Sequence, residues 1–307
     1  MNYNKEDWLS ALGHPSGKLA SGKVNLIDKY PCEDFDIELF EQENGQGRHQ
    51  RVMLAIPNGL TEPAPAIAVP FYFPEAMLGF DPKTGEMLEQ FKDIEMMLHL
   101  VRRGYICASA DAYHLTYIQD DKEYSGFDRW QCAADELMRD HPDYSGMGKL
   151  FDDTELLIDL LSADKRVDKT RIGIAGHSLG GKMAFYTGCL DKRISAILTS
   201  DFGIGWDQTN WHNDWYWGAK KEALIQNGMD HSQLLSIAAP KPFCLLGGKY
   251  DTDESLKVML KASGYSSTPE RLKFINHKAG HRPPFWALEE GYDFLDRWVK
   301  NKPSGLA

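Results

Sequence analysis

Residues 172–181 decide the fold, and their sequence is Ile172-Gly173-Ile174-Ala175-Gly176-His177-Ser178-Leu179-Gly180-Gly181. A β-type apolar run leads into this segment, and a helix-type run over residues 179–190 follows it. The pattern Gly-x-Ser-x-Gly at a strand-to-helix turn holds its serine in a strained backbone conformation, and the two glycines avoid a steric clash. The turn also places the serine at a helix N-terminus, which favours a developing oxyanion. We therefore predict that Ser178 is a nucleophile.

The rest of the chain alternates short apolar runs with amphipathic segments. The apolar or alternating runs predict strands at residues 35–41, 51–56, 65–71, 105–109, 171–175, 194–200, 243–246 and 272–275. Helical periodicity predicts helices at residues 87–102, 150–161, 179–190, 255–262 and 286–298. This alternation predicts an α/β protein with a mostly parallel central sheet and helices on both faces. Ligands of such a sheet bind beyond the carboxyl ends of its strands.

We expect residues 1–307 to form a single domain, because a chain of this length with 42% hydrophobic residues can bury one large core. Residues 1–33 are predicted to be an N-terminal arm with a short helix at 7–12. Residues 111–148 are predicted to be rich in loops. Residues 201–238 are predicted to be an irregular, aromatic-rich insertion over the active site.

Composition excludes several classes of protein. The net charge is -11 and no cluster of Lys and Arg is present, so we expect no nucleic-acid partner. No run approaches the roughly 18 apolar residues that span a bilayer, so no membrane partner is expected. The five scattered cysteines predict free thiols, and with no apolar leader at the N-terminus they favour the cytoplasm. The sequence predicts no particular oligomeric state.

The sequence contains no pattern of metal ligands. No CxxC or HExxH motif occurs. Asp111 and His114, which follow one predicted strand, offer only two ligands. We therefore expect no metal.

A serine hydroxyl needs a general base, and the base needs an acid that orients it. His281 follows the last predicted strand and is the first choice for the base, with His277 as the alternative. With this kind of turn the chain order is serine, acid, histidine. Asp251, at the tip of the turn after residues 243–246, is therefore the first choice for the acid. Asp253 is the second choice, and Asp201, at the end of the preceding strand, is also a candidate.

The groups that stabilise an oxyanion are predicted from position alone. One donor is expected to be the N–H of Leu179, the residue after the nucleophile. The second is expected from the loop after residues 65–71, where Tyr72 or Phe73 would supply an N–H.

Four tryptophans lie within twelve residues of the insertion, at Trp206, Trp211, Trp215 and Trp217. Aromatic faces interleaved with polar groups suit carbohydrate rings, so these residues are candidates for substrate binding. The alternative is that they pack together as a small core under a lid. His177, beside the nucleophile, is a further candidate substrate-binding residue.

Several motifs together resemble the dienelactone-hydrolase and acetyl-xylan-esterase-like branch of the α/β-hydrolases. The resemblance extends over about residues 50 to 300 and is carried by residues 126–129, 152–153, 167–173, 176–182, 248–251 and 280–281. It implies an α/β-hydrolase fold, a triad of Ser178, Asp251 and His281, and no cofactor. It also implies hydrolysis of carboxylic esters, often of acetylated or otherwise esterified sugars. Dienelactone hydrolases proper use a cysteine nucleophile, so Ser178 argues against that activity.

We therefore predict a serine esterase that acts through an acyl-enzyme. Its substrate is expected to be a small-molecule ester of a short, acetyl-type acyl group, and esters of carbohydrates are among the candidates. The alternatives are a peptidase or amidase of the same fold, or a non-catalytic binding protein that shares it.

Overall fold

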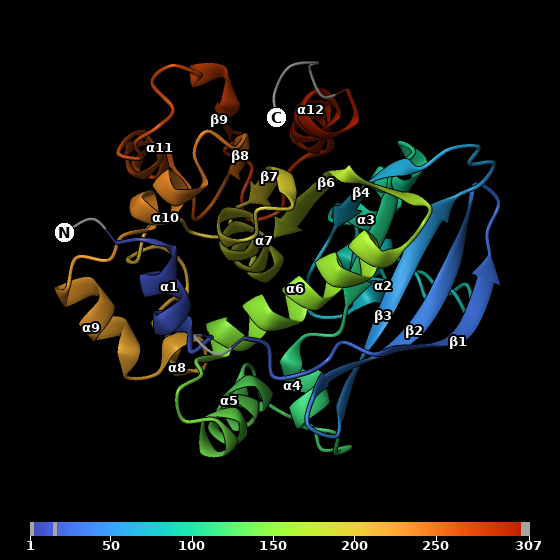
Figure 1. The fold of residues 1–307 in the computed structure, drawn as a ribbon, viewed down its shortest axis with the longest axis horizontal. Coiled ribbons are helices and arrows are strands. Elements are labelled where there is room, and N and C mark those ends of the chain that lie inside the picture. The colour runs from blue at the N-terminus through green and yellow to red at the C-terminus, as the bar shows by residue number, and fades with distance from the viewer. Residues whose placement is uncertain (1–2, 15–16, 302–307) are drawn as a thin grey trace.

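The computed structural model describes residues 3–14 and 17–301, and Figure 1 shows a twisted sheet with helices on both faces. The remaining residues, 1–2, 15–16 and 302–307, belong to the predicted arm and single domain and lie outside the described residues. The strands of the sheet are β1 (Val24–Pro31), β2 (Phe35–Gly45), β3 (Arg48–Pro57), β4 (Ala64–Ala68), β5 (Ile106–Ala110), β6 (Val167–His177), β7 (Ile194–Ser200), β8 (Phe243–Gly247) and β9 (Leu272–Asn276).

The strands lie in the order β1-β2-β3-β5-β4-β6-β7-β8-β9. From β5 to β9 every neighbouring pair is parallel, whereas β1, β2 and β3 pair in antiparallel fashion and join β5. The predicted mostly parallel sheet is confirmed. Strands β4, β5 and β8 are buried at every position, because helices cover both of their faces.

Two hydrophobic cores lie on the two faces of the sheet. One face carries α1 (Lys5–Leu12), α4 (Tyr113–Tyr117), α5 (Asp128–Asp140), α6 (Gly146–Ala163), α7 (Leu179–Leu190), α8 (Asp214–Trp217), α9 (Lys220–Gln226) and α10 (His231–Ala238). The other face carries α2 (Pro74–Leu78), α3 (Met96–Arg102) and α12 (Phe285–Leu295), with a final turn at Asp296–Lys300. Helix α11 (Asp253–Leu260) follows β8.

Several elements differ from the sequence-based prediction. The helix expected at 87–102 begins only at Met96, because Asp93 has a left-handed φ of 76° that interrupts the preceding backbone. Strand β1 lies within the predicted arm. It forms an exposed edge of the sheet. Because neither of its faces is buried, its sequence lacks the apolar pattern by which a strand is recognised. Helix α5 lies in the segment predicted to be rich in loops, and the insertion contains α8, α9 and α10.

Two expectations from composition can be compared with the structure. Within residues 3–14 and 17–301, no helix combines the length and the apolar character needed to cross a bilayer. The five cysteines are free, as predicted.

Candidate active site

Ser178 lies in the tight bend between β6 and α7, at the carboxyl end of the sheet. Its φ of 54° and ψ of -115° form the strained turn that the motif predicts. A Cβ at Gly176 would lie 2.1 Å from the carbonyl oxygen of Gly180, and a Cβ at Gly180 would lie 2.0 Å from that of Pro70. Only glycine fits at either position, so the sequence around the bend sets its geometry.

A chain of hydrogen bonds joins Ser178 to a carboxylate through His281. The Ser178 Oγ lies 3.0 Å from His281 Nε2, and His281 Nδ1 lies 2.7 Å from Asp201 Oδ2. The imidazole is held between two rings, His177 at 4.6 Å and Tyr250 at 5.0 Å between centroids. This is the arrangement in which a histidine can take a proton from a serine while a carboxylate orients it.

The prediction that Asp251 contacts the histidine is wrong. Its carboxylate accepts hydrogen bonds from the N–H groups of Gly203 and Ile204, at 2.8 Å each, and from Ser255 Oγ at 2.9 Å. The contact with the imidazole is made by Asp201. The reason is that Asp201 directly follows β7, the strand beside β6, whereas Asp251 follows β8, one strand further from the nucleophile.

The other candidates, His277 for the base and Asp253 for the acid, lie close to His281 and Asp251 in sequence but make different contacts. Asp253 is exposed and accepts a hydrogen bond from the side-chain amide of Asn276 at 2.9 Å. His277 is buried and accepts from the N–H of Ala279 through Nδ1, so it turns back on its own loop. Of the two histidines after β9, His281 is therefore the one that reaches Ser178.

The charge state of Asp201 follows from its surroundings. Burial opposes ionisation, but the hydrogen bond with His281 and the N–H groups of Asp251 and Tyr250 outweigh it and lower the pKa of Asp201. Asp251 behaves in the opposite way, because burial raises its pKa to about 6. Asp201 is thus the carboxylate that stays ionised next to the histidine.

The loop after β4 lies against the first turn of α7, where an oxyanion site is expected. The close approach of Pro70 to Gly180 fixes this contact. The carbonyl oxygen of Tyr72 accepts from the N–H of Ala112 at 3.0 Å, which orients the peptide that follows. Among the hydrogen bonds of the described residues, none uses the N–H of Tyr72 or of Phe73 as a donor.

Lys182, four residues after the nucleophile, is a buried cation that sequence reasoning missed. Its side chain is 2% exposed, and its Nζ lies 3.0 Å from Asn210 Oδ1 and over the rings of Trp211 and Tyr216. Burial lowers the pKa of Lys182 to about 7. The sequence signal that could have revealed this buried lysine is its place in a predicted helix whose other residues are mostly apolar or small.

Replacing Lys182 with methionine should remove a pH dependence of stability. The ordinary lysine pKa is 10.5. Between pH 7 and that value the unfolded chain therefore binds more protons, and the wild type gains up to about 1.4 kcal/mol of stability per pH unit. We expect this contribution to be absent in Lys182→Met and present in Lys192→Met, which changes an exposed lysine. Urea unfolding at pH 7, 8 and 9 measures it, and equal slopes in the wild type and Lys182→Met would contradict the assignment.

The aromatic insertion is packed rather than open. Trp211, Trp215 and Trp217 are 1%, 2% and 1% exposed, so their ring faces are covered by protein and the prediction that they bind substrate is wrong for this conformation. Their rings instead contact the neighbouring Tyr186, Trp130 and Tyr216. The alternative of a small aromatic core is the one that the structure contains. Trp206 is only partly buried and stays a candidate.

His177 is also buried, at 2% exposure, and its Nδ1 lies 3.1 Å from Ser200 Oγ. Burial lowers its pKa to about 3, so the ring is neutral at physiological pH. Its contact with the ring of His281 makes it a support for the base. The prediction that it binds substrate is wrong for this conformation.

One group of potential metal ligands occurs among the described residues, and it consists of His14, Asp152 and Glu155. His14 Nε2 lies 3.0 Å from Asp152 Oδ1, and Asp152 Oδ2 accepts from the N–H of Leu19. These hydrogen bonds join the N-terminal arm to α6. The three side chains are therefore explained as an anchor that holds the arm against this helix. The pair considered from the sequence is also otherwise engaged, since Asp111 binds Arg51 and His114 stacks on Trp130.

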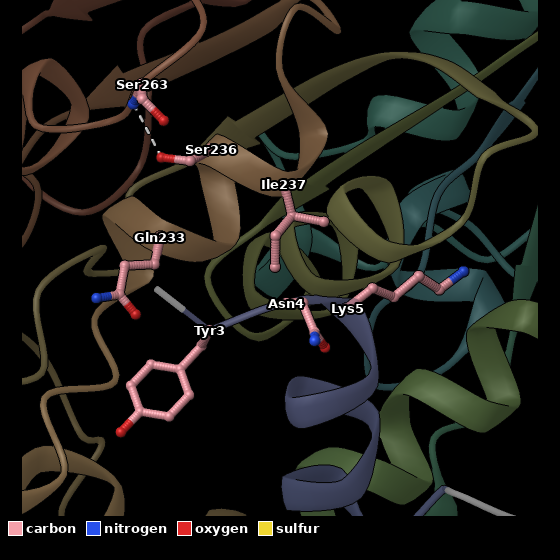
Figure 2. Close-up of a pocket in the computed structure, with 7 residues that line it drawn as sticks. All are labelled: Tyr3, Asn4, Lys5, Gln233, Ser236, Ile237 and Ser263. Carbon is pink, nitrogen blue, oxygen red and sulfur yellow. Dashed lines mark hydrogen bonds between the residues drawn. The ribbon is translucent and has the colours of Figure 1, made fainter. Parts of the chain in front are cut away.

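A surface pocket of about 360 Å³ lies between the start of α1 and α10, and Figure 2 shows the residues that line it. Its lining residues are Tyr3, Asn4, Lys5, Gln233, Ser236, Ile237 and Ser263. None of them belongs to the hydrogen-bonded chain of Ser178, so that chain marks a separate candidate site.

Comparison with solved structures decides the fold. A candidate acetyl xylan esterase from Bacteroides fragilis superposes with a TM-score of 0.69 at 18% identity, covering 91% of this chain and 75% of its own. The glucuronoyl esterase of Teredinibacter turnerae gives a TM-score of 0.68 at 17% identity, covering 96% of this chain and 86% of its own. The chain has the α/β-hydrolase fold. The predicted fold class is confirmed.

Sequence comparisons point to the same group. The family model of acetyl xylan esterase matches residues 84–202, a stretch that contains Ser178 and Asp201 and ends before His281. A hydrolase candidate of Bacillus subtilis, YtaP, is 24% identical over 165 residues, which are 50% of this chain and 54% of the relative. The chain thus spans about half the length of this relative. The predicted resemblance to acetyl-xylan-esterase-like α/β-hydrolases is confirmed.

Proposed function

We propose that this α/β-hydrolase is a serine carboxylic-ester hydrolase that acts through an acyl-enzyme, with Ser178 as nucleophile, His281 as general base and Asp201 as the orienting acid. The observation that carries the proposal is the pair of hydrogen bonds that joins these three side chains, 3.0 Å and 2.7 Å long. A serine at a strained turn with a hydrogen-bonded, oriented imidazole is the arrangement that acyl transfer requires.

The reaction proceeds in two halves. In the first half, His281 Nε2 accepts the proton of Ser178 while Oγ attacks the carbonyl carbon of the ester. The resulting imidazolium, stabilised by Asp201, donates this proton to the oxygen of the leaving alcohol, and the acyl group stays on Ser178. In the second half, His281 takes a proton from water as the water oxygen attacks the acyl carbon. The imidazolium then returns this proton to Ser178 Oγ as the acyl–oxygen bond breaks and the acid is released. The net change is cleavage of one ester by one water molecule.

Backbone donors stabilise the negative oxygen formed in each half. The first donor is the N–H of Leu179 at the start of α7, where the helix dipole adds a favourable field. The second donor is the N–H of Tyr72 or Phe73, because their loop lies against this turn. Fixed donors of this kind stabilise the transition state without reorganisation during the reaction.

The substrate class that we propose is an ester of a carbohydrate, with a small, acetyl-type acyl group as the first choice. Support comes from the acetyl xylan esterase family model and from similar structures that bear the names acetyl xylan esterase and glucuronoyl esterase. The two names differ in which partner of the ester is the sugar. Trp206, which is partly exposed on the insertion, is the candidate for contact with a sugar ring.

Three further parts of the proposal follow from composition. We place the enzyme in the cytoplasm, because its cysteines are free. We expect no nucleic-acid partner at a net charge of -11. We expect no membrane partner either, and we assign no oligomeric state.

A panel of esters tests the substrate class. It compares acetylated xylo-oligosaccharides, a methyl ester of glucuronate, p-nitrophenyl esters of graded acyl length and a peptide anilide. We expect the highest kcat/KM on an acetylated saccharide, activity that falls as the acyl group lengthens, and no cleavage of the anilide. Preference for the glucuronate ester would overturn the acetyl assignment and leave the esterase assignment standing.

Two other outcomes of the same panel would overturn the esterase itself. Cleavage of the anilide with higher kcat/KM than any ester would indicate a peptidase or amidase of this fold. Saturable binding of a saccharide with no turnover of any compound would indicate a non-catalytic binding protein. The control is the Ser178→Ala variant, in which residual hydrolysis measures contaminating enzymes.

A further inference from the structure

Two neighbouring loops at the carboxyl end of the sheet hold each other through their carboxylates. Asp201 begins the loop after β7, and its side chain accepts from the N–H groups of the loop after β8, at residues 248–251 and distances of 2.8–3.2 Å. Asp251 ends that second loop, and its side chain accepts from Gly203 and Ile204 in the first one. Each carboxylate thus fixes the backbone that carries the other.

We propose that Asp251 is a positioning residue, which holds the loop after β7 so that Asp201 meets His281. The proposal rests on the proposed function, since it concerns the same triad. It assigns Asp251 no contact with substrate or with the imidazole, because the groups that contact its carboxylate are Gly203, Ile204 and Ser255.

The backbone after β7 needs such a restraint. Asp201 has a left-handed φ of 42° and Gly203 a φ of 75°. A non-glycine residue in this region is strained and persists only where surrounding contacts hold it. The two hydrogen bonds to Asp251 fall on the residues directly after this strained point, at 203 and 204. Without them, the loop is free to relax and to carry the Asp201 carboxylate out of line with His281 Nδ1.

The two oxygens of the Asp201 carboxylate make different contacts, so the alignment of Asp201 with His281 is sensitive to rotation of this carboxylate. Oδ1 accepts from Gly248, Tyr250 and Asp251, while Oδ2 faces His281 at 2.7 Å and accepts a longer bond from the N–H of Lys249 at 3.2 Å. A rotation of the carboxylate that keeps the backbone contacts would move Oδ2 away from the imidazole. Displacements of about 1 Å at a reacting group cost on the order of 100-fold in rate. Movement of residues 201–204 should therefore lower kcat.

The test uses a graded pair of substitutions. Asp251→Asn keeps one acceptor oxygen for Ile204 and Ser255 but turns an amide toward the N–H of Gly203, whereas Asp251→Ala removes both acceptors. We expect kcat per folded site to fall by about 10-fold in the first variant and about 100-fold in the second, with KM unchanged. The control Asp253→Asn alters an exposed carboxylate two residues further on and should keep kcat within about twofold.

A double-mutant cycle with Asp201→Asn separates positioning from an independent role. If Asp251 acts through Asp201, the double variant should be no slower than Asp201→Asn alone. Multiplication of the two effects would overturn the proposal, and so would wild-type kcat in Asp251→Asn and Asp251→Ala. A purely structural role would lower the free energy of unfolding while leaving kcat per folded site unchanged. Should the alanine variant not fold, the asparagine variant and the cycle still decide the question.

Failure of this inference is distinguishable from failure of the proposed function. If Ser178→Ala loses turnover while both Asp251 variants keep it, only the positioning role is wrong. If Ser178→Ala keeps turnover, the triad itself is wrong and the effects of Asp251 have another cause.

Discussion

Ser178→Ala is expected to lose turnover by about 10⁴-fold or more, with the fold unchanged. The Ser178 hydroxyl is the group that attacks the ester, and alanine has none. The hydrogen bond of this hydroxyl is made with His281, so its loss leaves no buried backbone group without a partner. Alanine also carries the Cβ that serine already has at this strained φ, so the bend gains no new clash.

The measurement is kcat on p-nitrophenyl acetate for each purified variant, together with the midpoint of thermal unfolding. The matched control is Ser195→Ala, a serine at the start of β7 whose hydroxyl donates to the carbonyl oxygen of Thr170. We expect the control to keep kcat within about twofold. Turnover by Ser178→Ala at a tenth of the wild-type rate or more would contradict the assignment of the nucleophile.

Asp201→Asn is expected to lower kcat by about 10³- to 10⁴-fold. Three backbone N–H groups point at Oδ1 and one, from Lys249 at 3.2 Å, points at Oδ2, so the carbonyl oxygen of asparagine takes the place of Oδ1. The amide nitrogen then faces His281 Nδ1 and donates to it. The ring is forced into the tautomer that carries its proton on Nε2, and that proton points at Ser178. A histidine in this state cannot act as a base.

The same assay ranks the two carboxylates. We expect Asp201→Asn to be at least tenfold slower than Asp251→Asn, because only Asp201 contacts the imidazole. The reverse order would return the role of the acid to Asp251, the residue that the sequence favours. Binding of a non-hydrolysable ester analogue should be equal in both variants and the wild type, since neither carboxylate is assigned a contact with substrate.

The fold and the nucleophile could be predicted from the sequence because their signals are local. The two glycines around Ser178 are required by contacts of about 2 Å within the bend and with Pro70. Short apolar runs between helical segments are enough to predict a parallel sheet. The place of His281 after a glycine, in the loop between the last strand and the final helix, was likewise enough to favour it over His277, and the structure brings it to Ser178.

The acid could not be predicted in the same way. Asp201 and Asp251 lie in the loops that follow two neighbouring parallel strands, and each is a carboxylate just beyond the sheet. The choice between them depends on a left-handed backbone at Asp201 and on hydrogen bonds between residues about 50 apart in sequence. Neither has a signal in a single sequence.

The tryptophans and Lys182 illustrate a second limit. A high density of aromatic residues predicts that large rings gather but not whether their faces are open to substrate. In the structure, the rings of Trp211 and Tyr216 cover the ammonium group of Lys182. This contact depends on the packing of the insertion against α7, which local periodicity does not describe.

Labelling with a fluorophosphonate probe, followed by peptide mapping, tests the assignment of the nucleophile most directly. We predict one adduct per chain on Ser178 in the wild type, and labelling slowed by at least about 100-fold in His281→Ala, because the hydroxyl then lacks its base. An adduct on another residue, or no adduct on a folded chain, would contradict the claim that Ser178 is an activated nucleophile.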